Sequence, residues 1–248
     1  MSDWLGYIQD ELQKQFAKRQ LKLLMGLALL IGIGSSWIKY NLLQQSNSAF
    51  LEASILPLTT LQLLSGFILP LFIFALGSEL IISEFGDGTI KNLFSLPLSR
   101  AQLFFGKLAA GMCSIALILV CVLVPTIIAD LLMQGLPSLS QVGSLAIGTI
   151  GIFLFGGMIL TLANTIAIWT KSAGSGMLIG VVAWIGMGPA AMFIQGIQRY
   201  LPNQLDHWYM PLIQGGDLLR VISPLCFMIS YTVIFTVLGF YKFNMKEV

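Results

Sequence analysis

Residues 103–129 read LFFGKLAAGMCSIALILVCVLVPTIIA, and this stretch decides the fold. It is longer than the roughly 20 residues that a helix needs to cross about 30 Å of hydrocarbon. Five further apolar runs occupy 21–38, 58–82, 142–169, 174–195 and 221–241. The runs follow one another with little sequence between them. This pattern predicts six membrane-spanning helices rather than the buried helices of a soluble protein.

The composition supports the same fold class. The chain has 248 residues, of which 56% are apolar and only 10% are charged, and its mean hydropathy is +0.87. A soluble domain carries about 25% charged residues, and too little sequence remains outside the apolar runs to form one. The net charge of +2 with dispersed bases excludes nucleic acid as a partner. We therefore expect an all-α membrane protein whose surroundings are the lipid bilayer.

The placement of lysine and arginine predicts the orientation. With the amino terminus inside, ten of the thirteen basic residues fall on cytoplasmic segments, as the positive-inside rule requires. The ten are Lys14, Lys18, Arg19, Lys22, Lys91, Arg100, Lys107, Lys171, Lys242 and Lys246. We expect a multi-pass protein of the bacterial cytoplasmic membrane with both termini inside.

The segment before the first span has an amphipathic pattern. Its apolar side consists of Trp4, Leu5, Ile8, Leu12, Gln15 and Phe16, with acidic and basic residues opposite. This pattern favours an interfacial helix that lies along the inner membrane surface over a merely solvated helical end. The predicted organisation is an interfacial helix at 1–20 and a six-span domain at 21–248. The latter includes a cytoplasmic loop at 83–101 and an outer loop at 196–220.

The cytoplasmic loop contains a short amphipathic helix. Asp87 or Thr89 can cap its start, and Pro97 stops it. Its apolar face consists of Ile90, Leu93 and Phe94. From the periodicity alone, such a helix either docks onto a partner or rests on lipid headgroups.

The loop resembles the intracellular loop of type-2 ABC-transporter permeases. The similarity rests on Glu84-x-x-x-Gly88-Thr89, Leu96-Pro97-Leu98-Ser99-Arg100 and Gly106-Lys107-Leu108. In that family the loop docks its short helix into a groove on a cytoplasmic ATPase, so the resemblance makes 90–96 a coupling helix. It implies a set of ATPase-coupling residues: Glu84, Gly88, Thr89, Ile90, Leu93, Phe94, Pro97 and Arg100.

The resemblance also implies partners and a division of labour. Such permeases pair with a second permease copy, as homodimers or heterodimers, and each binds an ATPase subunit, giving two ATPase copies per complex. This chain lacks a phosphate-binding loop, because Gly106-Lys107 is followed by Leu108 and not by serine or threonine. ATP and magnesium are therefore expected in the ATPase partner, and no cofactor on this chain.

Other function classes remain as alternatives. A membrane enzyme is disfavoured, because His207 is the single histidine and paired metal ligands are absent, so neither catalytic residues nor a metal site is assigned. Acidic residues within spans could serve an ion-driven secondary carrier, but Glu79 and Asp130 lie near the ends of their spans, where both can reach the membrane interface. A third class is a sensing or scaffolding subunit of a membrane complex.

The span composition and the outer loop bear on the cargo. Spans with little central charge suit a lipid, drug or peptide of hydrophobic or amphipathic character, so we expect export of such a compound. In the outer loop, Trp208 and Tyr209 have two interpretations. Aromatic residues at this level usually anchor a protein in the membrane interface, and the alternative is an outer gate for substrate.

Overall fold

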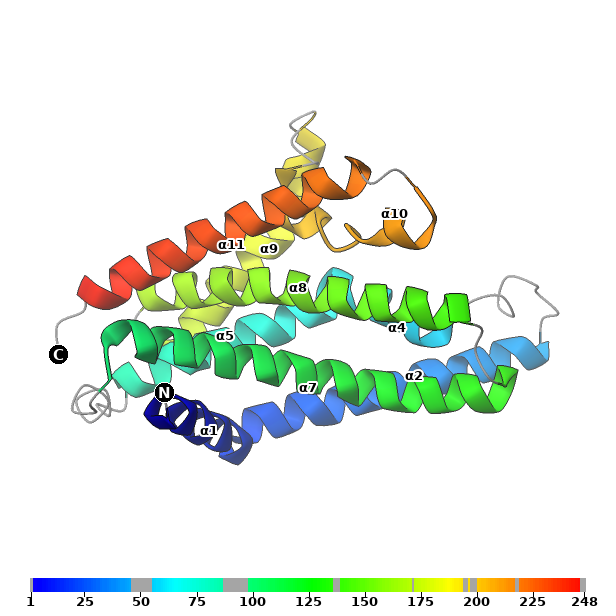
Figure 1. Ribbon diagram of the computed structural model, residues 1–248, viewed down its shortest axis with the longest axis horizontal. Helices are drawn as coiled ribbons and strands as arrows, with labels where there is room; N and C mark the ends of the chain where they lie inside the picture. The colour runs from blue at the N-terminus through cyan, green and yellow to red at the C-terminus, as the bar shows by residue number, and fades with distance from the viewer. Residues whose placement is uncertain are drawn as a thin grey trace.

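The computed structural model describes residues 2–45, 55–86, 98–135, 139–170, 172–193, 196, 200–216 and 219–245, and the regular secondary structure within these ranges is entirely helical (Figure 1). The elements are α1 (Ser2–Ala17), α2 (Arg19–Gln45), α4 (Leu56–Leu63), η1 (Leu64–Ile68), α5 (Leu69–Gly86), α7 (Arg100–Gln134), α8 (Leu139–Trp169), α9 (Ala173–Phe193), η3 (Pro202–Gln204), α10 (Met210–Ile213) and α11 (Leu219–Met245). The cytoplasmic loop predicted at 83–101 is therefore shorter in the structure, because residues 83–86 are the last residues of α5 and α7 begins at Arg100.

The six predicted spans are confirmed as helices long and apolar enough to cross a membrane. They are Arg19–Leu42, Leu56–Ile82, Arg100–Met133, Ser140–Trp169, Ala173–Ala190 and Leu219–Met245. The second span is made of three elements in line, because α4, the π-helical turn η1 and α5 follow one another without a break. A π-helical turn inside a longer helix is uncommon and often occurs at functional sites.

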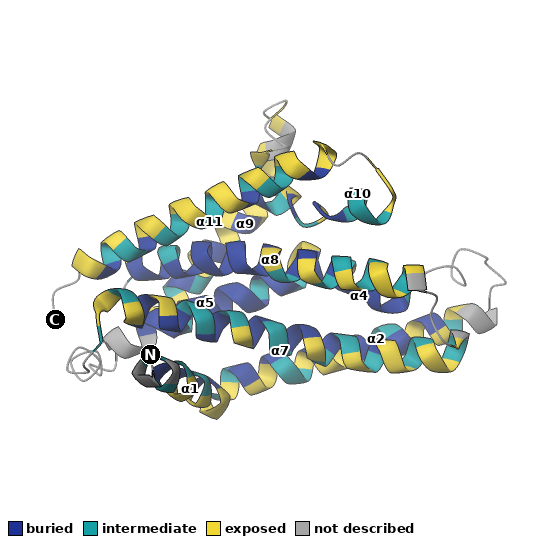
Figure 2. Cartoon of the chain, viewed as in Figure 1, coloured by how far each residue is buried: buried dark blue, intermediate teal, exposed yellow. Residues whose placement is uncertain are grey.

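The spans pack around α5. This helix contacts α8 and α9, while α2 packs along α7 and α11 packs along α8. Figure 2 shows that α5 is largely buried, whereas α11 exposes most of its length. Because exposed side chains of the spans are apolar, the outer surface of the bundle suits a lipid environment.

Close helix approach depends on glycine at two crossings. A Cβ atom on Gly180 of α9 would lie 2.4 Å from the Phe74 ring of α5. A Cβ atom on Gly32 of α2 would lie 2.6 Å from Cγ of Pro125, the proline inside α7. Both contacts are too short for any larger residue, so these glycines pack helices of the same chain together.

The two ends of the bundle differ in what they carry. α1, the last turns of α11, the end of α5 and the start of α7 lie at one end (Figure 1). We call this end the inner end, following the orientation predicted from the sequence, which stays a prediction. At the opposite, outer end, residues 200–216 leave the line of the spans and fold back against α4 and α8. We call residues 200–216 the outer cap.

Candidate functional site

The predicted coupling helix falls outside the described residues. α5 ends at Gly86 and α7 begins at Arg100, and residues 87–97 between them are not described. The residues concerned are Gly88, Thr89, Ile90, Leu93, Phe94 and Pro97, to which the Glu84 side chain is added. Their assignment stays a prediction. The structure does describe the frame that holds the two ends of this loop.

A capping box fixes the point where the loop enters α7. The Ser99 hydroxyl accepts a hydrogen bond from the Gln102 backbone amide at 3.2 Å, and the Ser99 amide donates to Gln102 Oε1 at 2.8 Å. Reciprocal caps of this kind stabilise a helix start by about 1 kcal/mol. The Ser-x-x-Gln spacing is typical of such a cap and could have predicted it from the sequence. The sequence analysis instead assigned the neighbouring Pro97 and Arg100 to coupling, from the resemblance to the permease loop.

The first turn of α7 also contacts both terminal helices. Arg100 Nη1 donates to the Asn244 carbonyl at the end of α11, at 2.7 Å. The Trp4 indole of α1 donates to the Gln102 carbonyl at 3.2 Å. Arg100, a predicted coupling residue, therefore ties the carboxyl-terminal side of the loop to α11, and Trp4 ties it to α1.

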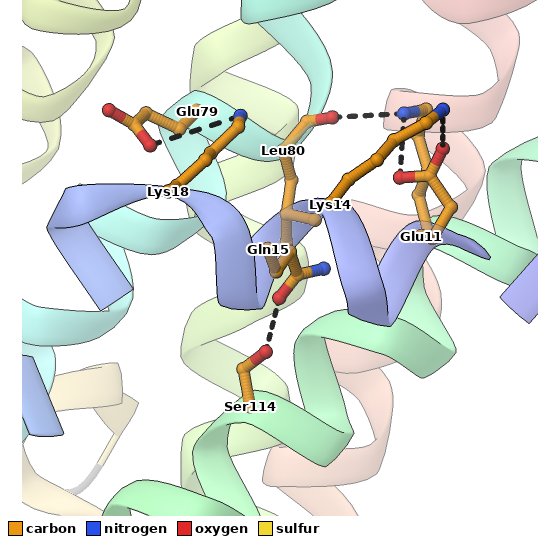
Figure 3. Close-up of polar contacts among 8 residues, drawn as sticks. Glu11, Lys14, Gln15, Lys18, Glu79, Leu80 and Ser114 are labelled. Carbon is orange, nitrogen blue, oxygen red and sulfur yellow. Dashed lines mark hydrogen bonds and ion pairs between the residues drawn. The ribbon is translucent and has the colours of Figure 1, made fainter. Parts of the chain in front are cut away.

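A buried ion pair joins α1, α5 and α7 just behind the loop. Lys107 Nζ lies 3.4 Å from Glu11 Oε2 and donates to the Leu80 carbonyl at 3.2 Å, while Lys14 Nζ lies 3.2 Å from Glu11 Oε1. The side chains of Lys107 and Glu11 are only 2% and 4% exposed. Figure 3 shows these contacts between the helices. We call Glu11, Lys14, Lys107 and the Leu80 carbonyl the inner junction.

Two further polar contacts flank the inner junction. The Ser114 hydroxyl of α7 donates to the Gln15 side-chain carbonyl of α1. Lys18 Nζ, just beyond α1, lies 3.9 Å from Glu79 Oε2 of α5 (Figure 3). The contacts therefore run along α1 and bind it to the two helices from which the loop emerges.

The buried side of α1 overlaps the predicted apolar side only in part. Gln15 of the predicted side is buried against the bundle, as are Tyr7 and Glu11, which were not assigned to it, whereas Phe16, which was assigned to it, is 40% exposed. The expected apolar face thus coincides only in part with the face that is buried in protein. Whether α1 also lies at the membrane surface stays a prediction.

The charges of the inner junction compensate one another. Burial raises the pKa of Glu11, but the Lys107 and Lys14 charges and their hydrogen bonds outweigh this effect, so the pKa lies below its usual 4.5. Removing a charge from water costs several kcal/mol unless partners replace the lost solvation. Glu11 pairs with both Lys14 and Lys107, and Lys107 donates to the Leu80 carbonyl in addition to contacting the Glu11 carboxylate. Glu11 therefore stays ionised at neutral pH.

The Gly106-Lys107 pair has a physical explanation in this arrangement. A Cβ atom on Gly106 would lie 2.6 Å from Cε1 of Tyr7, so only glycine lets the Tyr7 ring of α1 rest on α7. The next residue, Lys107, then reaches the carboxylate one turn further along α1. The sequence analysis used Lys107 for orientation, for the family resemblance and to exclude a phosphate-binding loop, but it did not identify Glu11 as its partner. A lysine within an apolar run was the available signal, because such a residue needs a buried partner.

The outer cap holds the other predicted site. Trp208 is 8% exposed and its indole donates to the Gly151 carbonyl of α8 at 3.1 Å. Tyr209 is fully buried, and a Cβ atom on Gly151 would lie 2.4 Å from its ring. The interpretation of these two residues as lipid-facing anchors is therefore wrong, because both pack inside the bundle. Their role as an outer gate stays a prediction.

The span carboxylates that suggested an ion carrier have basic partners. Asp130 Oδ1 lies 2.9 Å from Lys39 Nζ, whose side chain is 4% exposed, and this pair joins α7 to α2 near the outer end. Glu79 is the partner of Lys18 at the inner end. Both carboxylates thus have structural partners, which weakens the case for a proton or sodium relay.

The chain matches a known protein family. A family model described as ABC-2 family transporter protein matches residues 7–188, from Tyr7 in α1 to Gly188 in α9. The matched range includes the inner junction and the predicted coupling loop. No curated protein matches the chain.

Proposed function

We propose that this chain, which belongs to the ABC-2 family of transporter proteins, exports its substrate with energy from ATP that is hydrolysed by a separate cytoplasmic subunit. The family makes the chain a membrane-spanning transport subunit rather than an enzyme, and permeases of this family generally work with an ABC ATPase. The observation that carries the proposal is the inner junction, which holds together the helices on both sides of the loop at 83–101.

The inner junction gives the loop a rigid base. Lys107 binds the Leu80 carbonyl two turns before the end of α5 and binds Glu11 of α1, so a push on the loop moves three helices as a unit. Ser99 and Arg100 hold the carboxyl-terminal side of the loop to α7 and α11. Force applied by a partner would therefore reach the bundle instead of being absorbed at the loop ends.

The α2–α7 pair offers a path from the inner end to the outer end. The two helices touch closely where Gly32 meets Pro125, and the Lys39–Asp130 pair joins them near their outer ends. Because α1 is bound to the start of α7, motion of the inner junction would tilt this pair as a body. The proposed consequence is a change in packing beneath the outer cap.

The outer cap would then open the exit. Trp208 and Tyr209 are buried against Gly151 of α8, and we propose that they form the outer gate. The apolar exposed surfaces of the spans favour a hydrophobic or amphipathic cargo such as a lipid, drug or peptide. A complex with a second permease copy and two ATPase subunits, in the cytoplasmic membrane with both termini inside, completes the proposal.

The loop assignment is tested by co-purification. Co-expressed with an ABC ATPase subunit, the parent chain should retain the ATPase in detergent, and Phe94→Asp should lose it, because a carboxylate cannot enter an apolar groove without a large desolvation cost. Phe193→Asp is the matched control, since Phe193 is 87% exposed in α9 and lies away from the loop. Thermal unfolding shows whether each variant is folded. Full ATPase retention by folded Phe94→Asp would contradict the proposal.

The runner-up functions make opposite predictions. An ion-driven carrier moves solute without nucleotide, and a sensing or scaffolding subunit moves none under any condition. Transport that depends on ATP and on the partner separates the three classes.

A further inference from the structure

Three polar side chains lie close together where the outer cap meets α4 and η1. They are Gln62 of α4 and Asp206 and Tyr209 of the outer cap. Gln62 of α4 donates through Nε2 to the Met210 sulfur at 3.0 Å. Asp206 Oδ2 lies 3.8 Å from the position of a Cβ atom on Gly66, so the carboxylate rests over bare backbone of η1. Tyr209 follows in the same turn of the cap. The cluster sits at the π-helical part of the second span, where functional sites often occur.

The Tyr209 hydroxyl is buried without a hydrogen-bond partner among the described residues. Burial, with the Asp206 charge adding to it, raises the pKa of Tyr209 to about 12, and the nearby Gln62 amide opposes this only in part. Gln62 gives its hydrogen bond to sulfur, which is a weak acceptor. A buried hydroxyl without a well-formed hydrogen bond is costly, so the Tyr209 hydroxyl is suited to accept a hydrogen bond from a ligand.

Asp206 supplies the charge of this cluster. Its side chain is 15% exposed, which leaves the carboxylate within reach of a ligand, and its ion-pair partner in the described part of the chain is His207 Nε2 at 3.4 Å. His207 pairs by charge only when protonated and is itself 51% exposed. Burial raises the pKa of Asp206, while the His207 charge and backbone amides lower it in part. Among the described residues, the carboxylate thus has no permanently charged cationic partner.

We propose that Asp206, Tyr209 and Gln62 bind the ammonium group of an amphipathic substrate as it reaches the outer cap. An ammonium offers three donors and a positive charge, which match a carboxylate, a hydroxyl oxygen and an amide oxygen. The apolar tail would lie along the exposed span surface, where Phe67 of η1 is 49% exposed. This site rests on the proposed transport function and narrows its cargo to cationic amphiphiles.

The test is binding of octylamine to the chain in nanodiscs of neutral lipid, measured by titration calorimetry without nucleotide. Empty nanodiscs correct for partition into lipid, and octanol is the matched neutral probe. We expect saturable binding of octylamine and none of octanol. Because no ATPase or ATP is present, failure of ATP coupling leaves this result unchanged, so the two proposals are tested separately.

Variants separate ligand binding from a structural role. Asp206→Asn should weaken octylamine binding by about tenfold or more, as expected for a lost charge-assisted hydrogen bond. Tyr209→Phe should weaken binding severalfold, yet leave the melting temperature of the free chain equal or higher, because it removes an unpaired hydroxyl. Asp10→Asn, an exposed carboxylate in α1, is the control and should bind like the parent.

Two results would overturn the proposal. One is binding of octanol as strong as that of octylamine, or heat that never exceeds lipid partition. The other is unchanged octylamine binding in both Asp206→Asn and Tyr209→Phe.

Discussion

The inner junction and the outer cap both contain buried polar groups, but these groups are satisfied to different degrees. At the inner junction, Glu11 has two lysine partners and Lys107 has a carboxylate and a carbonyl. At the outer cap, the Tyr209 hydroxyl has no partner in the described region and Asp206 has an exposed histidine. From this difference we expect the inner end to move as one body and the outer end to separate, as proposed above.

The largest expected effect comes from breaking the inner ion pair. Glu11→Ala leaves Lys107 charged and buried, which should destabilise the chain by about 3–5 kcal/mol. The double variant Glu11→Leu with Lys107→Met removes both charges and should recover most of that loss, as measured by thermal unfolding in detergent. Nucleotide-driven transport should stay impaired in the double variant. Equal destabilisation by the single and double variants would show that the pair contributes only packing.

Glycine substitutions test the two regions by the same chemical change. Gly106→Ala should displace the Tyr7 ring, and Gly151→Ala should displace the Tyr209 ring. Each substitution should lower the free energy of unfolding by about 1–3 kcal/mol, because it overpacks a helix contact. Hydrogen exchange should then rise in residues 2–17 for the first variant and in residues 200–216 for the second. Exchange that rises equally in both segments in either variant would contradict two separable regions.

The two carboxylates should respond to pH with opposite sign. The folded-state pKa of Glu11 lies below 4.5, so its stabilising contribution is present above pH 4.5 and is lost as the pH falls through the folded value. The folded-state pKa of Asp206 lies above 3.8, so its ionisation weakens the fold as the pH rises through the folded value. Both pH effects on the free energy of unfolding should be smaller than the effect of breaking the Glu11–Lys107 ion pair.

Isosteric amides give the measurement. Melting temperatures of Glu11→Gln and Asp206→Asn are compared with the parent across the acid range. The Glu11→Gln deficit should shrink on acidification, and any gain from Asp206→Asn should vanish below pH 3.8. Parallel behaviour of the two variants would disprove the contrast.

The smallest effect is expected at Lys14. This residue contacts the same Glu11 carboxylate as Lys107, but its side chain is 55% exposed. Exposed ion pairs contribute about 0–1 kcal/mol, so Lys14→Met should barely change the melting temperature. A loss as large as that of Lys107→Ala would mean that burial does not govern the junction.

The spans were predictable because each depends on a continuous run of apolar residues. The run at 103–129, for instance, lies within the helix Arg100–Gln134. The inner junction was not predicted, because Glu11 and Lys107 are 96 residues apart and the sequence alone does not show which side of α1 meets α7. Helical periodicity identifies a face but not the element that covers it.

The outer cap shows the same limit in another form. Trp208 and Tyr209 were singled out in the outer loop, but their burial depends on Gly151, a distant residue that the sequence does not distinguish from the other span glycines. Aromatic residues near a span end usually face lipid. Here the chain folds back, and the glycine provides the space.

Transport by reconstituted vesicles tests the central claim most directly. Vesicles that contain the chain with an ABC ATPase subunit should move a fluorescently labelled amphiphile only when ATP is present, and Phe94→Asp should abolish this movement. Transport at the same rate by the chain alone, without the ATPase or nucleotide, would contradict the account.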